Sequence, residues 1–122
     1  MKPGQRILFV ALIAPVLGCD PFPPHTCSTD VLFGITLYVR DSVTNAMVGR
    51  ESLVILQSGT LADSVRETSF NDGPYGLAPE QAGTFTVTVE KAGYQRWSKS
   101  GVQVTKQDCH VVGVSVPALL QR

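Results

Sequence analysis

At 122 residues the chain is long enough for one domain, and its hydrophobic fraction of 43% excludes a disordered protein. Ten basic and ten acidic side chains balance, and the first 18 residues carry only the charges of Lys2 and Arg6. Without that segment, eight basic groups would face ten acidic ones. A nucleic-acid-binding protein needs a basic face that displaces counterions from phosphates, so this charge predicts no nucleic-acid partner.

Residues 1–18 have the order of an export signal. Lys2 and Arg6 supply positive charge, and residues 7–17 are uncharged and end at the small residue Gly18. As a helix this run would rise only about 16 Å, roughly half the hydrocarbon thickness of a bilayer. We therefore expect residues 1–18 to form a signal helix that is cleaved, and not a transmembrane span.

The residues around Cys19 indicate which kind of signal this is. Val16, Leu17, Gly18 and Cys19 together resemble a bacterial lipobox, after which a peptidase cuts and leaves the cysteine with a diacylglycerol on its sulfur. Val16 and Leu17 depart from the commonest residues at their positions, and ordinary secretion is the alternative. The resemblance predicts a lipoprotein of the bacterial cell envelope, attached to a membrane through Cys19 and facing the periplasm or the exterior.

The number of cysteines supports the same interpretation. The chain has three, so a lipid on Cys19 leaves Cys27 and Cys109 as an even pair in an oxidising compartment. We expect these two residues to form a disulfide, with two buried free thiols as the alternative. Such a bridge would close a loop of about 80 residues and stabilise a small domain strongly.

Residues 19–30 are expected to form a lipidated tether. The stretch DPFPPHT at 20–26 contains three prolines, which disfavour regular backbone hydrogen bonding and favour a stiff, extended chain. The eight residue steps from Cys19 to Cys27 reach at most about 28 Å. A bridge at Cys27 would therefore hold the folded domain close to the bilayer surface.

From residue 27 onward, apolar residues recur at every second position, which predicts half-buried strands. Residues 31–40 form the first expected strand, with Tyr38 on its outward face. Its inward face would hold Val31, Phe33, Ile35, Leu37 and Val39. Residues 83–90 alternate most clearly, with Phe85, Val87 and Val89 facing inward and Thr84, Thr86 and Thr88 facing outward.

Five further short strands are expected at 52–58, 61–68, 94–99, 102–105 and 110–116. Residues 61–68 are the most polar and fit an edge strand. The last strand would place Val112, Val114 and Val116 on one face. No segment after the signal has helical spacing, and the turns are rich in Gly, Pro, Asn and Asp. The pattern predicts an all-β fold, a single antiparallel β-sandwich of about seven strands.

Two motifs give this sandwich a family resemblance. DGPYGL at 72–77 and GTFTVTVEKAGY at 83–94 resemble the core signature of carboxypeptidase regulatory-like domains, and VRDSVTNAMV at 39–48 resembles a turn of that family. Asn45 and Met47 stand where the family usually has Gly and Pro. The resemblance implies a Greek-key, prealbumin-like or immunoglobulin-like sandwich at residues 31–118. Because members of the family are non-catalytic modules of peptidases, outer-membrane receptors and surface proteins, it also implies no enzymatic activity.

Candidate catalytic and metal-binding groups are few. The chain has no Gly-x-Ser-x-Gly elbow and no His-Glu-x-x-His motif, and we expect no cofactor. Its only histidines are His25 and His110, which a Cys27–Cys109 bridge would bring into one neighbourhood near Asp108. They are candidates for a divalent-metal site. Two solvated side chains beside a disulfide are the alternative.

A ligand-binding surface is the stronger hypothesis for function. Tyr94, Arg96 and Trp97 form an aromatic and basic group, and Tyr38 adds an outward aromatic ring. Tyr94 and Trp97 would have opposite phase in a regular strand, so one of them should belong to the core. An exposed Trp97 would suit stacking on a sugar or anchoring a protein.

These observations together predict a lipid-anchored, non-catalytic binding or assembly module outside the cytoplasm, with an envelope protein or a glycan as its partner. One alternative is a protein that binds a small ligand, either a glycan or a divalent metal. The other is a hydrolase on a transthyretin-like fold.

Overall fold

The structure is a computed structural model that describes residue 18 and residues 26–59, 61–66 and 71–122. For residues 61–66 it describes the backbone alone. The predicted signal helix, Cys19 and His25 lie outside these ranges. Within them, no helix is long and apolar enough to cross a membrane. The strands in this part of the chain are β1 (Phe33–Asp41), β2 (Leu53–Ser58), β3 (Leu61–Arg66), β4 (Tyr75–Pro79), β5 (Gly83–Glu90), β6 (Trp97–Gln107), β7 (His110–Val112) and β8 (Val114–Leu120).

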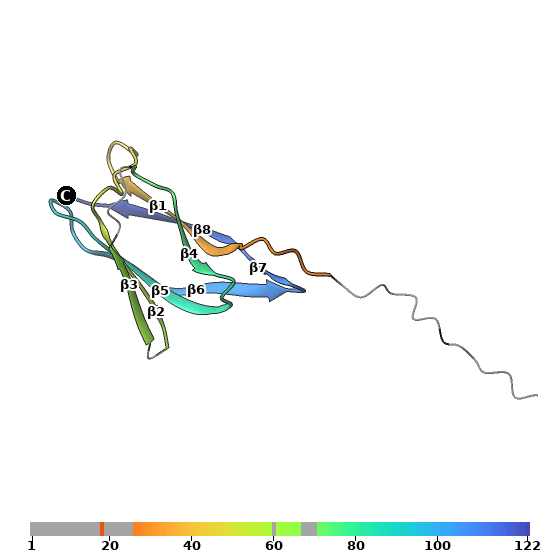
Figure 1. Cartoon of the computed structure of the whole chain (residues 1–122). Coiled ribbons are helices and arrows are strands. Elements are labelled where there is room, and N and C mark those ends of the chain that lie inside the picture. The colour runs from red at the N-terminus through yellow and green to blue at the C-terminus, as the bar shows by residue number, and fades with distance from the viewer. Residues whose placement is uncertain (1–17, 19–25, 60, 67–70) are drawn as a thin grey trace, which may run out of the picture.

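The strands form two sheets that pack as a β-sandwich (Figure 1), which confirms the predicted fold class. One sheet has the order β4-β1-β8 and the other the order β3-β2-β5-β6-β7, with β3 at an edge as expected. All pairings are antiparallel except β1 with β8, which run parallel with Leu37 opposite Val116. The antiparallel prediction is wrong for this pair, because the first and last strands are not joined by a hairpin that would set their direction.

The core lies between the two sheets and follows the alternation of the sequence. Side chains at every second position are buried in β5 and, from Ile35 onward, in β1, and the largest that are completely buried include Ile35, Leu37 and Val39. Val31 and Phe33, expected on the inward face, are exposed. Burying one such side chain contributes about 1.5–3 kcal/mol. Thr88, expected to face outward, is buried as well, and its hydroxyl lies 3.1 Å from the Ser98 hydroxyl.

Three stretches differ from the expected strands. β4 is not among the expected strands, because the glycines and the proline around Tyr75 and Leu77 are typical of turns. In the structure the side chains of both residues are buried. Residues 97–99 and 102–105 of two expected strands belong to the single strand β6, whereas residues 94–96 precede it. The pairing of β6 with β5 is irregular near Gly101. A bulge of this kind inserts a residue and resets the alternation.

The last expected strand, 110–116, divides at Gly113 into β7 and β8. Val111 is buried and Val112 is exposed, so the shared face predicted for Val112 and Val116 is wrong. The break at Gly113 changes the phase between the two strands. β8 then continues to Leu120, which is completely buried, beyond the expected end of the domain at residue 118.

The two ends of the sandwich carry different parts of the chain (Figure 1). At one end, which we call the disulfide end, the N-terminal segment leaves the body next to the β6–β7 hairpin. At the other, which we call the Asp41 end, the loop after β1 lies near the C-terminus of the described chain. β1 and β8 run between these ends (Figure 1).

Candidate functional site

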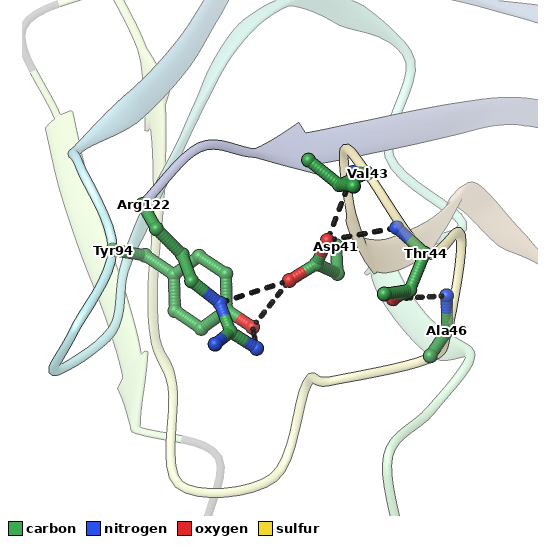
Figure 2. A network of polar contacts seen from close by, with 6 residues as sticks. All are labelled: Asp41, Val43, Thr44, Ala46, Tyr94 and Arg122. Carbon is green, nitrogen blue, oxygen red and sulfur yellow. Dashed lines mark hydrogen bonds and ion pairs between the residues drawn. The ribbon is translucent and has the colours of Figure 1, made fainter.

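A network centred on Asp41 organises the Asp41 end (Figure 2). Asp41 is the last residue of β1 and is only 3% exposed. Its Oδ1 accepts hydrogen bonds from the backbone N–H groups of Val43 at 2.8 Å and Thr44 at 3.0 Å. Asn45 follows with a φ of 59°, in the left-handed region that asparagine tolerates better than most residues. Asp41 therefore fixes the course of the loop after β1.

The second oxygen of Asp41 connects this loop to two distant segments. Oδ2 accepts a hydrogen bond from the Tyr94 hydroxyl at 2.9 Å and another from Arg122 Nε at 3.2 Å. The Arg122 guanidinium also lies 5.3 Å from the centre of the Tyr94 ring, and its Nη2 donates to the Tyr94 hydroxyl at 3.3 Å. Figure 2 shows the three side chains converging from the end of β1, the turn before β6 and the end of the chain.

These contacts set the charge of the network. The N–H groups of Thr44 and Val43 and the Tyr94 hydroxyl hold the pKa of Asp41 well below its usual range. The Tyr94 hydroxyl, followed by the Asp41 carboxylate, raises the pKa of Arg122 above its ordinary value. Both residues therefore stay charged at neutral pH and hold the loop through charge-assisted hydrogen bonds.

Three shallow depressions surround the network. The first has a volume of about 460 Å³ and the other two of about 360 Å³ each. The first and third share Gln121, and the second and third share Arg96, so they form one continuous surface. The residues around it include Ser42, Val43, Thr44, Glu51, Glu90, Lys91, Tyr94, Arg96, Trp97, Leu119, Gln121 and Arg122.

Three of the four predicted ligand-binding residues lie on this surface. Tyr94 and Trp97 are both half-buried against the core, which corrects the expectation that only one of them would belong to it. The expectation assumed that Tyr94 and Trp97 lie in one regular strand and point to opposite faces. Tyr94 instead lies in the turn that precedes β6. Arg96 is exposed and pairs with Glu90 at 3.4 Å. Tyr38 does not line these depressions; it lies on the outward face of β1, with the Arg40 guanidinium 5.8 Å from its ring centre.

The disulfide end contains a second polar cluster. Cys27 and Cys109 form the predicted disulfide, with their Cα atoms 5.4 Å apart. Next to it, His110 Nδ1 lies 2.7 Å from Glu80 Oε1, and His110 Nε2 lies 2.9 Å from the Ser28 hydroxyl. Among the residues that the structure describes, no three His, Cys, Asp or Glu side chains gather to hold a metal ion. His25, the other predicted candidate, lies outside them.

Ser28, His110 and Glu80 are bonded in the order found in Ser-His-acid hydrolases. Glu80 also accepts hydrogen bonds from the backbone N–H groups of Leu32, at 2.8 Å, and Val111, at 3.3 Å. The Leu32 N–H, followed by His110, lowers the pKa of Glu80. The Glu80 carboxylate accepts backbone hydrogen bonds both from the segment before β1 and from β7. We therefore interpret the Ser28–His110–Glu80 contacts as a structural clamp that holds the N-terminal segment against the sandwich.

Sequence reasoning missed the residues at the centre of both clusters. Asp41 had a usable signal, because an aspartate that ends a strand and precedes Ser, Val, Thr and Asn is typical of a side-chain-capped turn. Arg122, Glu80 and Ser28 had none, because their partners are 28 to 82 residues away in the chain.

Comparison of the chain with protein-family models, with curated proteins and with solved structures found no match. The resemblance to carboxypeptidase regulatory-like domains therefore remains a prediction from the residues alone.

The lowered pKa of Asp41 makes stability depend on pH in acid. Above 3.8, the ordinary pKa of aspartate, the side chain is ionised in both the folded and the unfolded chain. As the pH falls below that value, the unfolded chain binds the proton first, so the fold loses stability until the pH reaches the lower pKa of the folded state. We expect Asp41→Asn to reduce the melting temperature at neutral pH by several degrees and to flatten its fall in acid.

Thermal unfolding between about pH 2 and pH 6 measures this effect. Asp30→Asn is the control, because it removes the same charge from an exposed position. An Asp41→Asn variant that keeps the acid dependence of the wild type would show that Asp41 does not cause it.

Proposed function

We propose that this protein is a non-catalytic binding or assembly module of the bacterial cell envelope, held at a membrane by a lipid on Cys19. The observation that carries the proposal is the separation of the disulfide from the Asp41 network, which lie at opposite ends of the sandwich. Eight residue steps from Cys19 keep Cys27 within about 28 Å of the lipid. The Asp41 end then faces away from the membrane and is open to a partner.

The Asp41 end suits a protein partner. Its loop is held rigid by the contacts of Asp41, so little conformational entropy is lost on binding. Val43 is 91% exposed at the loop, beside the exposed guanidinium of Arg122. Arginine is one of the residues that are enriched at protein interfaces. Trp97 packs partly against the core, which leaves less of its ring for stacking on a sugar than the sequence allowed.

Photocrosslinking in envelope membranes tests this function. A photoreactive amino acid in place of Val43, in the full-length chain, should yield one discrete protein adduct, because that side chain projects from the proposed binding end. The same amino acid in place of Val112 is the matched control, since this valine is also exposed but lies at the disulfide end. Equal protein adducts from both positions, or none from position 43, would count against the Asp41 end as the binding surface.

A further inference from the structure

Exposed apolar side chains are concentrated at the disulfide end. Six large hydrophobic residues are exposed in the described part of the chain, and four of them lie at this end, with 43–61% of their surface open. The other two, Val43 and Leu119, lie toward the Asp41 end. We call the four residues at the disulfide end the apolar patch: Val31, Leu32, Phe33 and Val112.

The members of the apolar patch are close in space although they are far apart in sequence. The Glu80 carboxylate bonds the backbone N–H groups of Leu32 and Val111, and the Glu80 N–H donates to the Leu32 carbonyl at 2.9 Å. Val112 follows Val111 directly. The Phe33 ring lies over Gly76, where an added Cβ would come within 2.5 Å of the ring. The contacts of Glu80 with the backbone thus bring these residues to the same end of the sandwich, with Phe33 on β1 in one sheet and Val112 on β7 in the other.

The patch also lies where the chain leaves for its N-terminus. Cys27 is four residues before Val31, and its disulfide partner Cys109 is three residues before Val112. The bridge therefore borders the patch on both of its segments. With Cys19 at most about 28 Å from Cys27, a lipid on Cys19 would bring this end of the sandwich to the bilayer surface.

We propose that the apolar patch inserts into the interfacial region of the membrane that holds the lipid of Cys19, and so fixes the sandwich with its Asp41 end outward. The proposal rests on the proposed lipid anchor. Apolar side chains exposed together mark a contact surface, and at a bilayer such side chains enter the boundary between headgroups and acyl chains. A protein partner at this end would have to fit between the domain and the bilayer, within the reach of the short tether.

The charges around the patch indicate the kind of lipid surface it fits. Asp30 and Asp108 are exposed on the segments that carry the patch, and Lys106 is the exposed basic residue on β6 beside them. Among the described residues around the patch, these two acidic side chains and one basic side chain offer no basic cluster to anionic headgroups. The contact is therefore apolar and should form on a zwitterionic surface without anionic lipid.

Spin labels at two matched valines test the proposal. The variants Val112→Cys and Val43→Cys are prepared as the acylated mature protein with the native disulfide intact. Each carries a nitroxide on the new cysteine and is bound to phosphatidylcholine vesicles. We expect the label at position 112 to collide with a water-soluble nickel chelate several-fold less often than the label at position 43, and more often with oxygen. Adding phosphatidylglycerol should leave both labels unchanged.

Each other outcome has a defined meaning. A label at position 112 that is as accessible to the nickel chelate as the label at position 43, on protein that floats with the vesicles, would overturn the membrane contact and leave the lipid anchor standing. Protection that appears only with phosphatidylglycerol would also overturn it, because the contact would then depend on charge. Acylated preparations that fail to float with vesicles would remove the anchor, and both proposals would fall together.

Discussion

Replacing Cys27 and Cys109 together with serine is expected to lower the free energy of unfolding by roughly 4 to 5 kcal/mol. The disulfide joins residues 82 positions apart, so it removes a large part of the conformational freedom of the unfolded chain. A domain of this size has a total stability of about 5–15 kcal/mol, and the loss is a large share of it. Urea denaturation measures the change as a lower midpoint.

The remaining contacts of the disulfide end should survive in this variant. Ser28 still bonds His110, and Leu32 still bonds Glu80, so we expect the folded state to keep its structure while the midpoint falls. The wild-type protein under reducing conditions is the control, and it should unfold at the midpoint of the double variant. A double variant as stable as the oxidised wild type would contradict the stabilising role of the bridge.

Replacing Cys19 with alanine is expected to abolish fatty-acid incorporation and to release the mature protein from the membrane. Two acyl chains on one thioether give stable attachment, whereas the chain after residue 18 contains no apolar run long enough to span a bilayer. Metabolic labelling with an alkyne fatty acid, followed by separation of membrane and soluble fractions, measures both effects. Thermal unfolding of the sandwich should not change, because Cys19 precedes all of the strands.

The matched control for this variant lacks the other two cysteines. Cys27→Ala combined with Cys109→Ala should keep the fatty-acid label, because only Cys19 follows the lipobox-like residues. A label that persists in the Cys19→Ala variant, or disappears in the control, would show that the lipid is not on Cys19.

Features encoded by local alternation could be predicted from the sequence. The period of two located β1, β2 and β5, and the polar character of residues 61–68 identified β3 as an edge strand. The number of cysteines predicted the pairing of Cys27 with Cys109. Each of these predictions depends on the order or the number of residues, and the tertiary structure agrees with it.

Features that depend on breaks in the alternation of apolar and polar residues could not be predicted. Gly76 and the residues before it hid β4, and Gly101 and Gly113 each reset the phase of a strand without changing its hydrophobic content. The parallel pairing of β1 with β8 depends on how distant segments meet. For the same reason the sequence did not reveal that Tyr94 and Arg122, 53 and 81 residues away from Asp41, share its carboxylate.

The candidate binding surface was predicted only in part. Tyr94, Arg96 and Trp97 were recognised as a group, and the structure places them around neighbouring depressions. The sequence alone gave no reason to connect them to the loop after β1. That connection depends on the Tyr94 hydroxyl reaching Asp41, and it makes the group part of a larger surface.

The most direct test of a lipid-anchored module is the mass of the N-terminal peptide of the mature protein, purified from membranes of a bacterial host. We predict that the mature chain begins at Cys19 and that its first residue carries the mass of a diacylglycerol. A mature chain that begins elsewhere, or that begins at Cys19 without a lipid, would contradict the proposed anchor and with it the outward orientation of the Asp41 end.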